Sequence, residues 1–290
     1  MFLPRKVLEE KLRGFLEEDV GQGDITTYLM VPKNTVVEAE VVAKESGVVA
    51  GIEEAIVLFE SLNLKTEVLA SDGTHVKPKT SILRIIGDAR TLLSAERTLL
   101  NILSRMSGIA TATNQSVSKV RAAGYKTLVA CTRKVAPGLG YFDKKAVYLG
   151  DGDTHRLHLD DLVLIKNNHI KIVGSVNRAV RKARETVSFS KKVEVEVASV
   201  PDALEAAKAG ADIIMLDNFS PEETKKAASL LTKEGLRDTV LLEASGGITE
   251  KNVLEYAAAG VDIASIGEIT HSVKALDTSL EVVKVRQTKK

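Results

Sequence analysis

The residues best suited to chemistry are cations that gather in one stretch of the chain, 131–169. Two apolar runs, TLVA at 127–130 and LVLI at 162–165, read as short buried strands, and cations follow each of them directly. In a parallel α/β barrel the carboxyl ends of the strands form the working face. We therefore expect a pocket for a ligand with several negative charges, lined by Arg133, Lys134, Arg156 and Lys166. The alternative is a solvated basic loop.

Two glycine turns near the end of the chain are suited to binding phosphate. Ser245, Gly246 and Gly247 begin the turn SGGIT, and Gly267 begins the turn GEIT. Each turn follows an apolar strand candidate and is expected to open a helix, whose free N–H groups attract anions. The last two strand–helix loops form the phosphate site of phosphate-binding barrels. Two ordinary glycine turns are the alternative.

Carboxylates occupy further strand ends. In VEVEV at 193–197, Glu194 and Glu196 alternate with valines and therefore point to the same side of the strand. Inward charge is costly unless it is paired or functional. Glu196, nearer the carboxyl end, and Asp217, which closes DIIMLD, are both placed at the mouth of the barrel. They suit ribose hydroxyls, a divalent cation held through phosphates, or both. The alternative is a structural pair neutralised by lysines.

The elements that position these residues follow a βαβα pattern from residue 125 onward. Its strand candidates lie at 127–130, 162–165, 193–197, 212–216, 239–242 and 262–266. Its helix candidates lie at 175–185, 201–209, 221–233 and 250–259. Right-handed crossovers can close such units into a barrel or wind them as an open sheet, and the two glycine turns favour the barrel.

The earlier part of the chain looks like a small α+β unit. The segment 89–123 has helical periodicity, and Gly108 predicts a break between two helices. We place the domain junction there, which gives an amino-terminal domain at 1–107 and a barrel at 108–270. The remaining segment, 271–290, is expected to form a helix that packs back on the amino-terminal domain.

Composition limits the possible functions. The chain has 290 residues and a formal net charge of +1, which argues against a general nucleic-acid binder. It has a single cysteine, Cys131, so no intramolecular disulfide can form. No activating motif surrounds this thiol, and we interpret it as a packing residue. Because the sequence contains neither a signal-peptide core nor a membrane-length apolar run, we expect a cytoplasmic protein.

Taken together, the motifs resemble the quinolinate phosphoribosyltransferase family. The resemblance is carried, in family order, by EDVGQGDITT, AERTLLNILSRMSGIAT, TRKVAPGL, HRLHLDDLVLIKNNH, VEVEVAS, DIIMLDNFSPE, EASGGIT and GVDIASIGEITHS. It implies an amino-terminal α/β sandwich followed by an open, incomplete α/β barrel. It also implies synthesis of nicotinate mononucleotide, pyrophosphate and carbon dioxide from quinolinate and phosphoribosyl pyrophosphate, with Mg²⁺. It further implies a homodimer or higher homo-oligomer in which the partner's amino-terminal domain completes each site.

The resemblance also implies a role for each matching residue. Arg133, Arg156 and Lys166 would hold the quinolinate carboxylates, helped by Thr132 and His155. Lys134 would lie between quinolinate and the diphosphate, and Glu196 and Asp217 would contact the ribose hydroxyls and the metal-bound diphosphate. The 5′-phosphate would lie against Ser245, Gly246, Gly247 and Gly267. Arg97 would be lent by the partner subunit.

Some positions depart from the family pattern, and other functions stay open. The family often has arginine where Gly140 stands and aspartate where Asn167 stands, and we expect the change at Asn167 to matter little. His155 and His158 have i,i+3 spacing, but no third metal ligand is nearby. The alternatives are a related phosphoribosyltransferase, acting on another pyridine carboxylate or in molybdate metabolism, and a non-catalytic nucleotide-binding barrel.

Overall fold

The computed structural model describes residues 3–287, which divide into two compact units. The first unit contains the chain up to Thr111 together with the carboxyl-terminal segment from Val273, and the second runs from Ala112 to Ser272. The domain junction expected at 107/108 thus lies four residues before this division. Among the described residues, no helix is both long enough and apolar enough to cross a membrane.

The first unit is built on an antiparallel sheet with the strand order β12-β1-β5-β3. Its strands are β1 (Thr35–Ala43), β3 (Lys65–Val68), β5 (Thr80–Asp88) and β12 (Thr278–Gln287), and a separate pair is formed by β2 (Gly47–Val48) and β4 (His75–Val76). Its helices are α1 (Arg5–Val20), α2 (Ile25–Met30) and α3 (Ile52–Ser61). Because strand residues alternate between two faces, Val37, Ala39 and Val41 of β1 are all buried on one face of the sheet.

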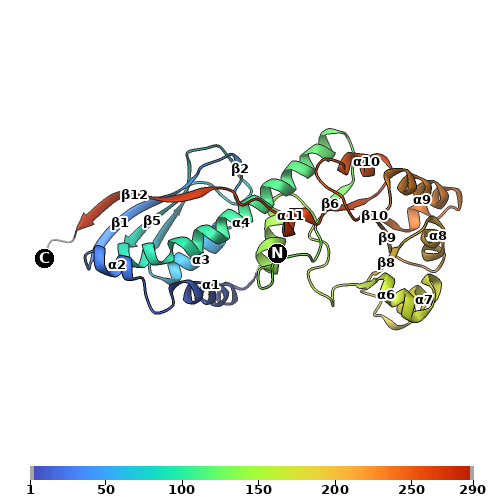
Figure 1. Cartoon of the computed structure of the whole chain (residues 1–290), viewed down its shortest axis with the longest axis horizontal. Coiled ribbons are helices and arrows are strands. Elements are labelled where there is room, and N and C mark those ends of the chain that lie inside the picture. Colours follow the sequence, from blue (N-terminus) through green and yellow to red (C-terminus); the bar gives the residue numbers. More distant parts are fainter. Residues whose placement is uncertain (1–2, 288–290) are drawn as a thin grey trace. The chain divides into compact units, whose positions relative to one another are not determined.

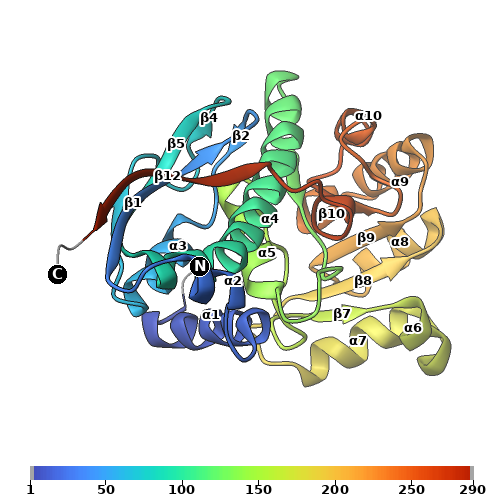
Figure 2. The ribbon, with the colours of Figure 1, turned by 60° about the vertical axis from the view of Figure 1, so that its left-hand side comes forward.

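The carboxyl-terminal helix expected at 271–290 is wrong for the described part of this segment. Residues Thr278–Gln287 form strand β12, which pairs antiparallel with β1 (Figure 2). This segment is rich in valine, a β-branched residue that favours strands over helices, and β1 offers it a free edge to pair with. The segment does return to the amino-terminal unit, but as a strand.

The break expected at Gly108 is also wrong. One helix, α4 (Ala89–Ala122), runs without interruption through this position. A Cβ atom on Gly108 would lie 2.2 Å from the carbonyl oxygen of Lys274. The glycine therefore serves the close approach of a crossing backbone, and it does not end the helix.

The second unit is a sheet of six parallel strands in the order β6-β11-β10-β9-β8-β7. The strands are β6 (Leu128–Ala130), β7 (Val163–Ile165), β8 (Val193–Val197), β9 (Ile213–Asp217), β10 (Leu241–Ser245) and β11 (Ile263–Ser265). Within the described chain, no pairing joins the two edge strands β6 and β7, so the sheet is an open barrel. A sandwich followed by an open barrel is the fold class that the sequence predicts, and it is confirmed.

Helices connect these strands and cover the outside of the sheet (Figure 1). They are α5 (Gly140–Leu149), α6 (Asn167–Val173), α7 (Val176–Thr186), α8 (Val200–Lys208), α9 (Pro221–Lys233), α10 (Val253–Ala258) and α11 (Glu268–His271), with a 3₁₀ turn at Arg237–Thr239. Local signals set their starts: Ser220 caps α9 in a capping box with Glu223, and Ser175 and Ser199 cap α7 and α8. These three helices lie where the sequence predicts them, to within a residue.

Candidate active site

The carboxyl ends of the six parallel strands surround one cavity of about 330 Å³. Every strand contributes to its lining, either from its last residues or from the loop that follows. The lining residues are Cys131, Thr132, Arg133, Lys134, His155, Arg156, Leu164, Lys166, Glu196, Met215, Asp217, Glu243, Ser245 and Ser265. The expected convergence of four cations and two carboxylates at strand ends is therefore confirmed.

The cations face the cavity with few internal partners. Arg133, which follows β6, makes no side-chain hydrogen bond or ion pair with any described residue, and neither does Lys134. Arg156 is 9% exposed, and both burial and the nearby Arg133 guanidinium lower its pKa. Two guanidinium groups that repel each other in a half-closed cavity are suited to binding an anion, which would relieve the repulsion.

The two carboxylates at the mouth lie close enough to interact. Burial raises the pKa of Glu196, and the charge of Asp217 raises it further, while Lys166 opposes the shift. The side-chain amide of Asn167 donates a hydrogen bond of 2.7 Å to Glu196. An aspartate at position 167 would instead add a third negative charge beside Glu196 and Asp217. The change at Asn167, which the sequence analysis expects to matter little, therefore affects the charge of this site.

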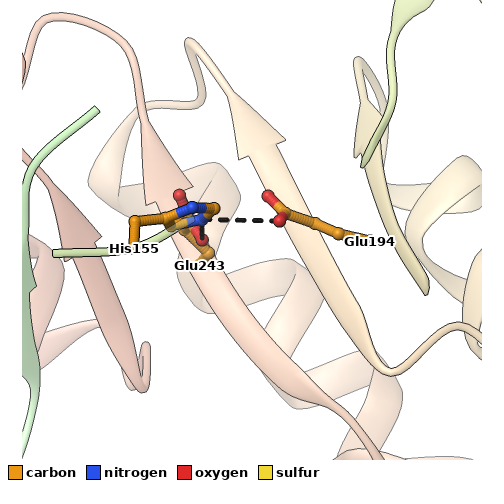
Figure 3. Close-up of side chains that lie close together, drawn as sticks. All are labelled: His155, Glu194 and Glu243. Atoms are coloured by element: carbon orange, nitrogen blue, oxygen red, sulfur yellow. Dashed lines mark hydrogen bonds and ion pairs between the residues drawn. The ribbon is translucent and has the colours of Figure 1, made fainter. Parts of the chain in front are cut away.

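His155 lines the cavity and has a left-handed backbone conformation with φ of 51°. Its Nε2 is 3.1 Å from Glu243 and 3.4 Å from Glu194, two glutamates with no exposed surface (Figure 3). Burial lowers the pKa of this ring, but the close contacts and charges of the two glutamates outweigh burial and raise the pKa to about 10. Burial likewise raises the pKa of Glu194. We call these three residues the floor cluster.

Sequence reasoning missed Glu243 and did not foresee that Glu194 would contact His155. A signal was present, because Glu243 is an acid inside the apolar run VLLEA of a buried strand, just as Glu194 is inside VEVEV. His158, by contrast, is exposed, so the His155–His158 metal pair does not exist. Cys131 is fully buried and burial raises the pKa of its thiol, in agreement with a packing role.

The two glycine turns lie at adjacent strands, since β10 and β11 pair with Ser245 opposite Ser265. Ser245 lines the cavity, whereas Gly246, Gly247 and Gly267 are not among its lining residues. A Cβ on Gly267 would lie 3.6 Å from Lys134, so this turn is next to a cavity cation. The helices after the turns are shorter than expected: α10 begins only at Val253, not at residue 250, and α11 has four residues. Phosphate binding here stays a prediction.

Comparison with known proteins assigns the chain to a family. Residues 24–107 match the model of the quinolinate phosphoribosyl transferase N-terminal domain, and residues 109–281 match that of its C-terminal domain. This chain belongs to the quinolinate phosphoribosyl transferase family.

Individual members of the quinolinate phosphoribosyl transferase family resemble the chain over nearly its whole length. A probable carboxylating nicotinate-nucleotide pyrophosphorylase of Methanothermobacter thermautotrophicus is 46% identical, with 93% of this chain and 97% of the relative covered. The carboxylating nicotinate-nucleotide pyrophosphorylase of Homo sapiens is 39% identical, with coverage of 84% and 82%. The solved nicotinate-nucleotide pyrophosphorylase of Francisella tularensis is 37% identical with a TM-score of 0.89, and 98% of each chain is covered.

Arg97 is the one proposed site residue of this quinolinate phosphoribosyl transferase that lies in the first unit. It is exposed on α4, and it makes no ion pair with Glu96 or with any other acid of residues 3–287. The alternative role for Arg97, a surface ion pair within its own helix, therefore finds no support. Its guanidinium is free to contact a group outside its own chain.

Proposed function

We propose that this chain transfers the phosphoribosyl group of phosphoribosyl pyrophosphate to quinolinate, with loss of carbon dioxide, to form nicotinate mononucleotide and pyrophosphate. One observation carries this proposal: a single cavity is lined by the cations Arg133, Lys134, Arg156 and Lys166 together with the carboxylates Glu196 and Asp217. This charge pattern suits a dicarboxylate acceptor next to a sugar on which positive charge develops. Family membership supports the same reaction.

The cations would bind quinolinate. Arg133 and Arg156 have planar guanidinium groups that match carboxylates in a bidentate manner, which an ammonium group cannot do. Lys166 adds a third positive charge from the end of β7, and Thr132 also lines the cavity. Three cations suit two carboxylates better than the single carboxylate of nicotinate.

The carboxylates would bind the ribose. When pyrophosphate leaves, positive charge develops at the ribose carbon, and Glu196 and Asp217 would stabilise that charge. Lys134 would neutralise the leaving pyrophosphate, and the turns with Ser245, Gly246, Gly247 and Gly267 would hold the 5′-phosphate. No side chain needs to form a covalent intermediate.

Mg²⁺ would be held through the pyrophosphate oxygens, and we assign no residue of the chain as a direct ligand. The donor set fits such an ion, because Glu196 and Asp217 place two oxygen-bearing acids at the mouth. When bound, the ion would neutralise charge on the leaving group. The pyridine nitrogen that attacks the ribose becomes cationic, and this cation accepts the electron pair that carbon dioxide leaves behind.

The active form would be a homodimer in which Arg97 serves the partner's cavity. Mixing Arg97→Ala and Lys134→Ala proteins tests this idea, since each variant alone should be inactive. Random exchange of subunits would give heterodimers with one doubly altered site and one intact site, so roughly a quarter of wild-type activity should return. If subunits exchange, as shown by mass spectrometry, and no activity returns, Arg97 serves its own subunit.

Separation of the reaction products tests the substrate. With phosphoribosyl pyrophosphate and Mg²⁺, quinolinate should give nicotinate mononucleotide, whereas nicotinate should give little. Efficient use of nicotinate would instead favour a related phosphoribosyltransferase. Binding of nucleotides without turnover of either acid would favour a non-catalytic barrel.

We place the enzyme in the cytoplasm, in keeping with its lone buried cysteine.

A further inference from the structure

The floor cluster places two fully buried glutamates and a histidine at the cavity, and the reaction described above gives the two glutamates no role. His155 contacts Glu194 on β8 and Glu243 on β10, and Figure 3 shows the ring with both carboxylates beside it. Glu243 also accepts a hydrogen bond of 2.6 Å from the hydroxyl of Ser265 on β11. Burying such groups is costly unless they are paired and serve a purpose.

The arrangement is suited to a proton and not to a metal ion. The spacing of one histidine and two glutamates would allow metal coordination. However, Nδ1 of His155 accepts a hydrogen bond of 2.7 Å from the backbone N–H of Arg156. A histidine that binds a metal through Nε2 normally donates from its other ring nitrogen, which this contact prevents. Nε2 therefore carries a proton, which it shares with the glutamates.

A neutral imidazole and two ionised carboxylates would carry a net charge of −2. At neutral pH the floor cluster holds one proton more than this reference state. The pKa of His155, raised to about 10 by the two glutamates, indicates this proton, and burial raises the pKa of Glu194 as well. The contact from the Arg156 N–H to Nδ1 leaves Nε2 as the ring nitrogen that faces the glutamates, so the extra proton lies on the side of Nε2 and the two carboxylates. Neither oxygen of Glu194 has a hydrogen-bond partner, so burial disfavours the charged form of this carboxyl.

The same ring is part of a dense set of contacts around the backbone of residues 154–156. Asp153 accepts a 2.6 Å hydrogen bond from the N–H of His155. The buried ammonium of Lys144 donates to the carbonyl oxygens of Thr154 and Arg156. A left-handed conformation is unfavourable for histidine, so this turn needs such anchors to persist. The ring's contacts with the glutamates are the anchors inside the barrel.

We propose that Glu194 and Glu243 are positioning residues: they hold the His155 ring on the floor, and the ring in turn fixes Arg156 for capture of a substrate carboxylate. Both ring nitrogens have internal contacts, so the ring contributes to substrate capture by holding Arg156. The contact from Nδ1 to the Arg156 N–H is the link between the cluster and the guanidinium.

Charge gives the cluster a second reason to stay protonated. A substrate with two negative charges would be repelled by two bare carboxylates beneath it. Arg156 lies close enough to Glu194 to lower its pKa, and Ser265 on β11 donates to Glu243, while Lys144 and Asp153 contact the backbone of residues 154–156. The shared proton and these cations keep the floor from opposing the substrate.

The test compares Glu243→Gln and Glu194→Gln with wild type, and uses Glu54→Gln as the control. Glu54 is equally buried but lies on α3 of the first unit. The proposal rests on the quinolinate activity, so steady-state kinetics form one arm. Glu243→Gln should raise the KM for quinolinate about tenfold or more, since it weakens a charge-assisted hydrogen bond, and should leave the KM for phosphoribosyl pyrophosphate unchanged. Glu54→Gln should change neither KM.

The second arm is independent of activity. The chain has only five histidines, so the ring ¹⁵N signals of His155 can be assigned by their loss in His155→Asn. In wild type they should stay constant from pH 6 to 8.5 and change only near pH 10, whereas Glu243→Gln should move that change toward 6.5. If Glu243→Gln does not fold, the same titration is measured in Glu194→Gln. This variant should fold, because the Glu194 carboxyl makes no hydrogen bond to a described residue that the change would break.

The outcomes separate the two proposals. If wild type turns over quinolinate and the folded variants keep its KM, or if both KM values rise together, the positioning role is wrong. If wild type shows no turnover of quinolinate, the proposed function fails and the ¹⁵N arm alone decides the role of the cluster. An unchanged titration of His155 in Glu243→Gln would then overturn it.

Discussion

At the scale of single residues, the account depends most on the two guanidinium groups of the cavity. Arg133→Ala and Arg156→Ala should each lower kcat/KM for quinolinate by several orders of magnitude. Either change removes a charge-assisted contact and leaves a substrate carboxylate unpaired in a half-closed cavity. Steady-state kinetics with quinolinate varied would measure this, and Arg184→Ala, which breaks a surface ion pair with Asp212 in the same unit, is the control. Near-normal kinetics in Arg133→Ala or Arg156→Ala would remove the basis of the site.

The sequence was informative about residues that follow strands and uninformative about residues beneath them. Arg133, Lys166 and Asp217 could be placed because each ends or follows an apolar run, and strand ends converge in a parallel barrel. Glu243 could not be paired with His155, because that contact joins β10 to the loop after α5 and depends on the order of strands in the sheet. The role of Asn167 likewise depends on a neighbouring strand, which residue types alone do not identify.

At the scale of elements, the turn after β10 offers a sharp test of phosphate binding. Gly246 has φ of 98°, and a Cβ there would lie 2.2 Å from the side-chain oxygen of Asn218 and 2.9 Å from its backbone nitrogen. Gly246→Ala should therefore displace the turn and raise the KM for phosphoribosyl pyrophosphate about tenfold or more, with a smaller effect on quinolinate.

Gly210→Ala is the matched control for this change. Gly210 also has positive φ, at 89°, but nothing lies within 4 Å of the Cβ it would gain. Gly210→Ala therefore introduces backbone strain but no steric clash of the new Cβ. This variant should lower thermal stability and leave the KM values for quinolinate and phosphoribosyl pyrophosphate unchanged. If Gly246→Ala behaves like Gly210→Ala, the turn after β10 does not hold the phosphate.

Elements with local signals were predictable, and elements defined by distant partners were not. Helices α7, α8 and α9 carry their own caps, so the sequence places them to within a residue. Strand β12 exists because β1, more than 200 positions earlier in the chain, offers it an edge. The glycine in α4 resembles a helix break, and only the passing backbone of Lys274 explains it.

At the scale of the whole molecule, the floor cluster should make stability depend on pH. The pKa of His155 is raised from 6.5 to about 10 in the folded chain, so its stabilising effect is complete below pH 6.5 and is lost as the pH rises through 10. The raised pKa of Glu194 acts in the same direction. The free energy of unfolding, measured with denaturant, should fall more steeply between pH 6.5 and 10 in wild type than in Glu243→Gln. Equal slopes would show that the cluster holds no extra proton.

The central claim is that the whole molecule joins quinolinate to phosphoribosyl pyrophosphate and removes one carboxylate. The most direct measurement uses quinolinate labelled in its 2-carboxyl group and follows carbon dioxide and pyrophosphate together. The account predicts that labelled carbon dioxide appears in equal amount to pyrophosphate, and only when phosphoribosyl pyrophosphate and Mg²⁺ are both present. Pyrophosphate formed without labelled carbon dioxide, or no reaction by the folded wild-type protein, would contradict it.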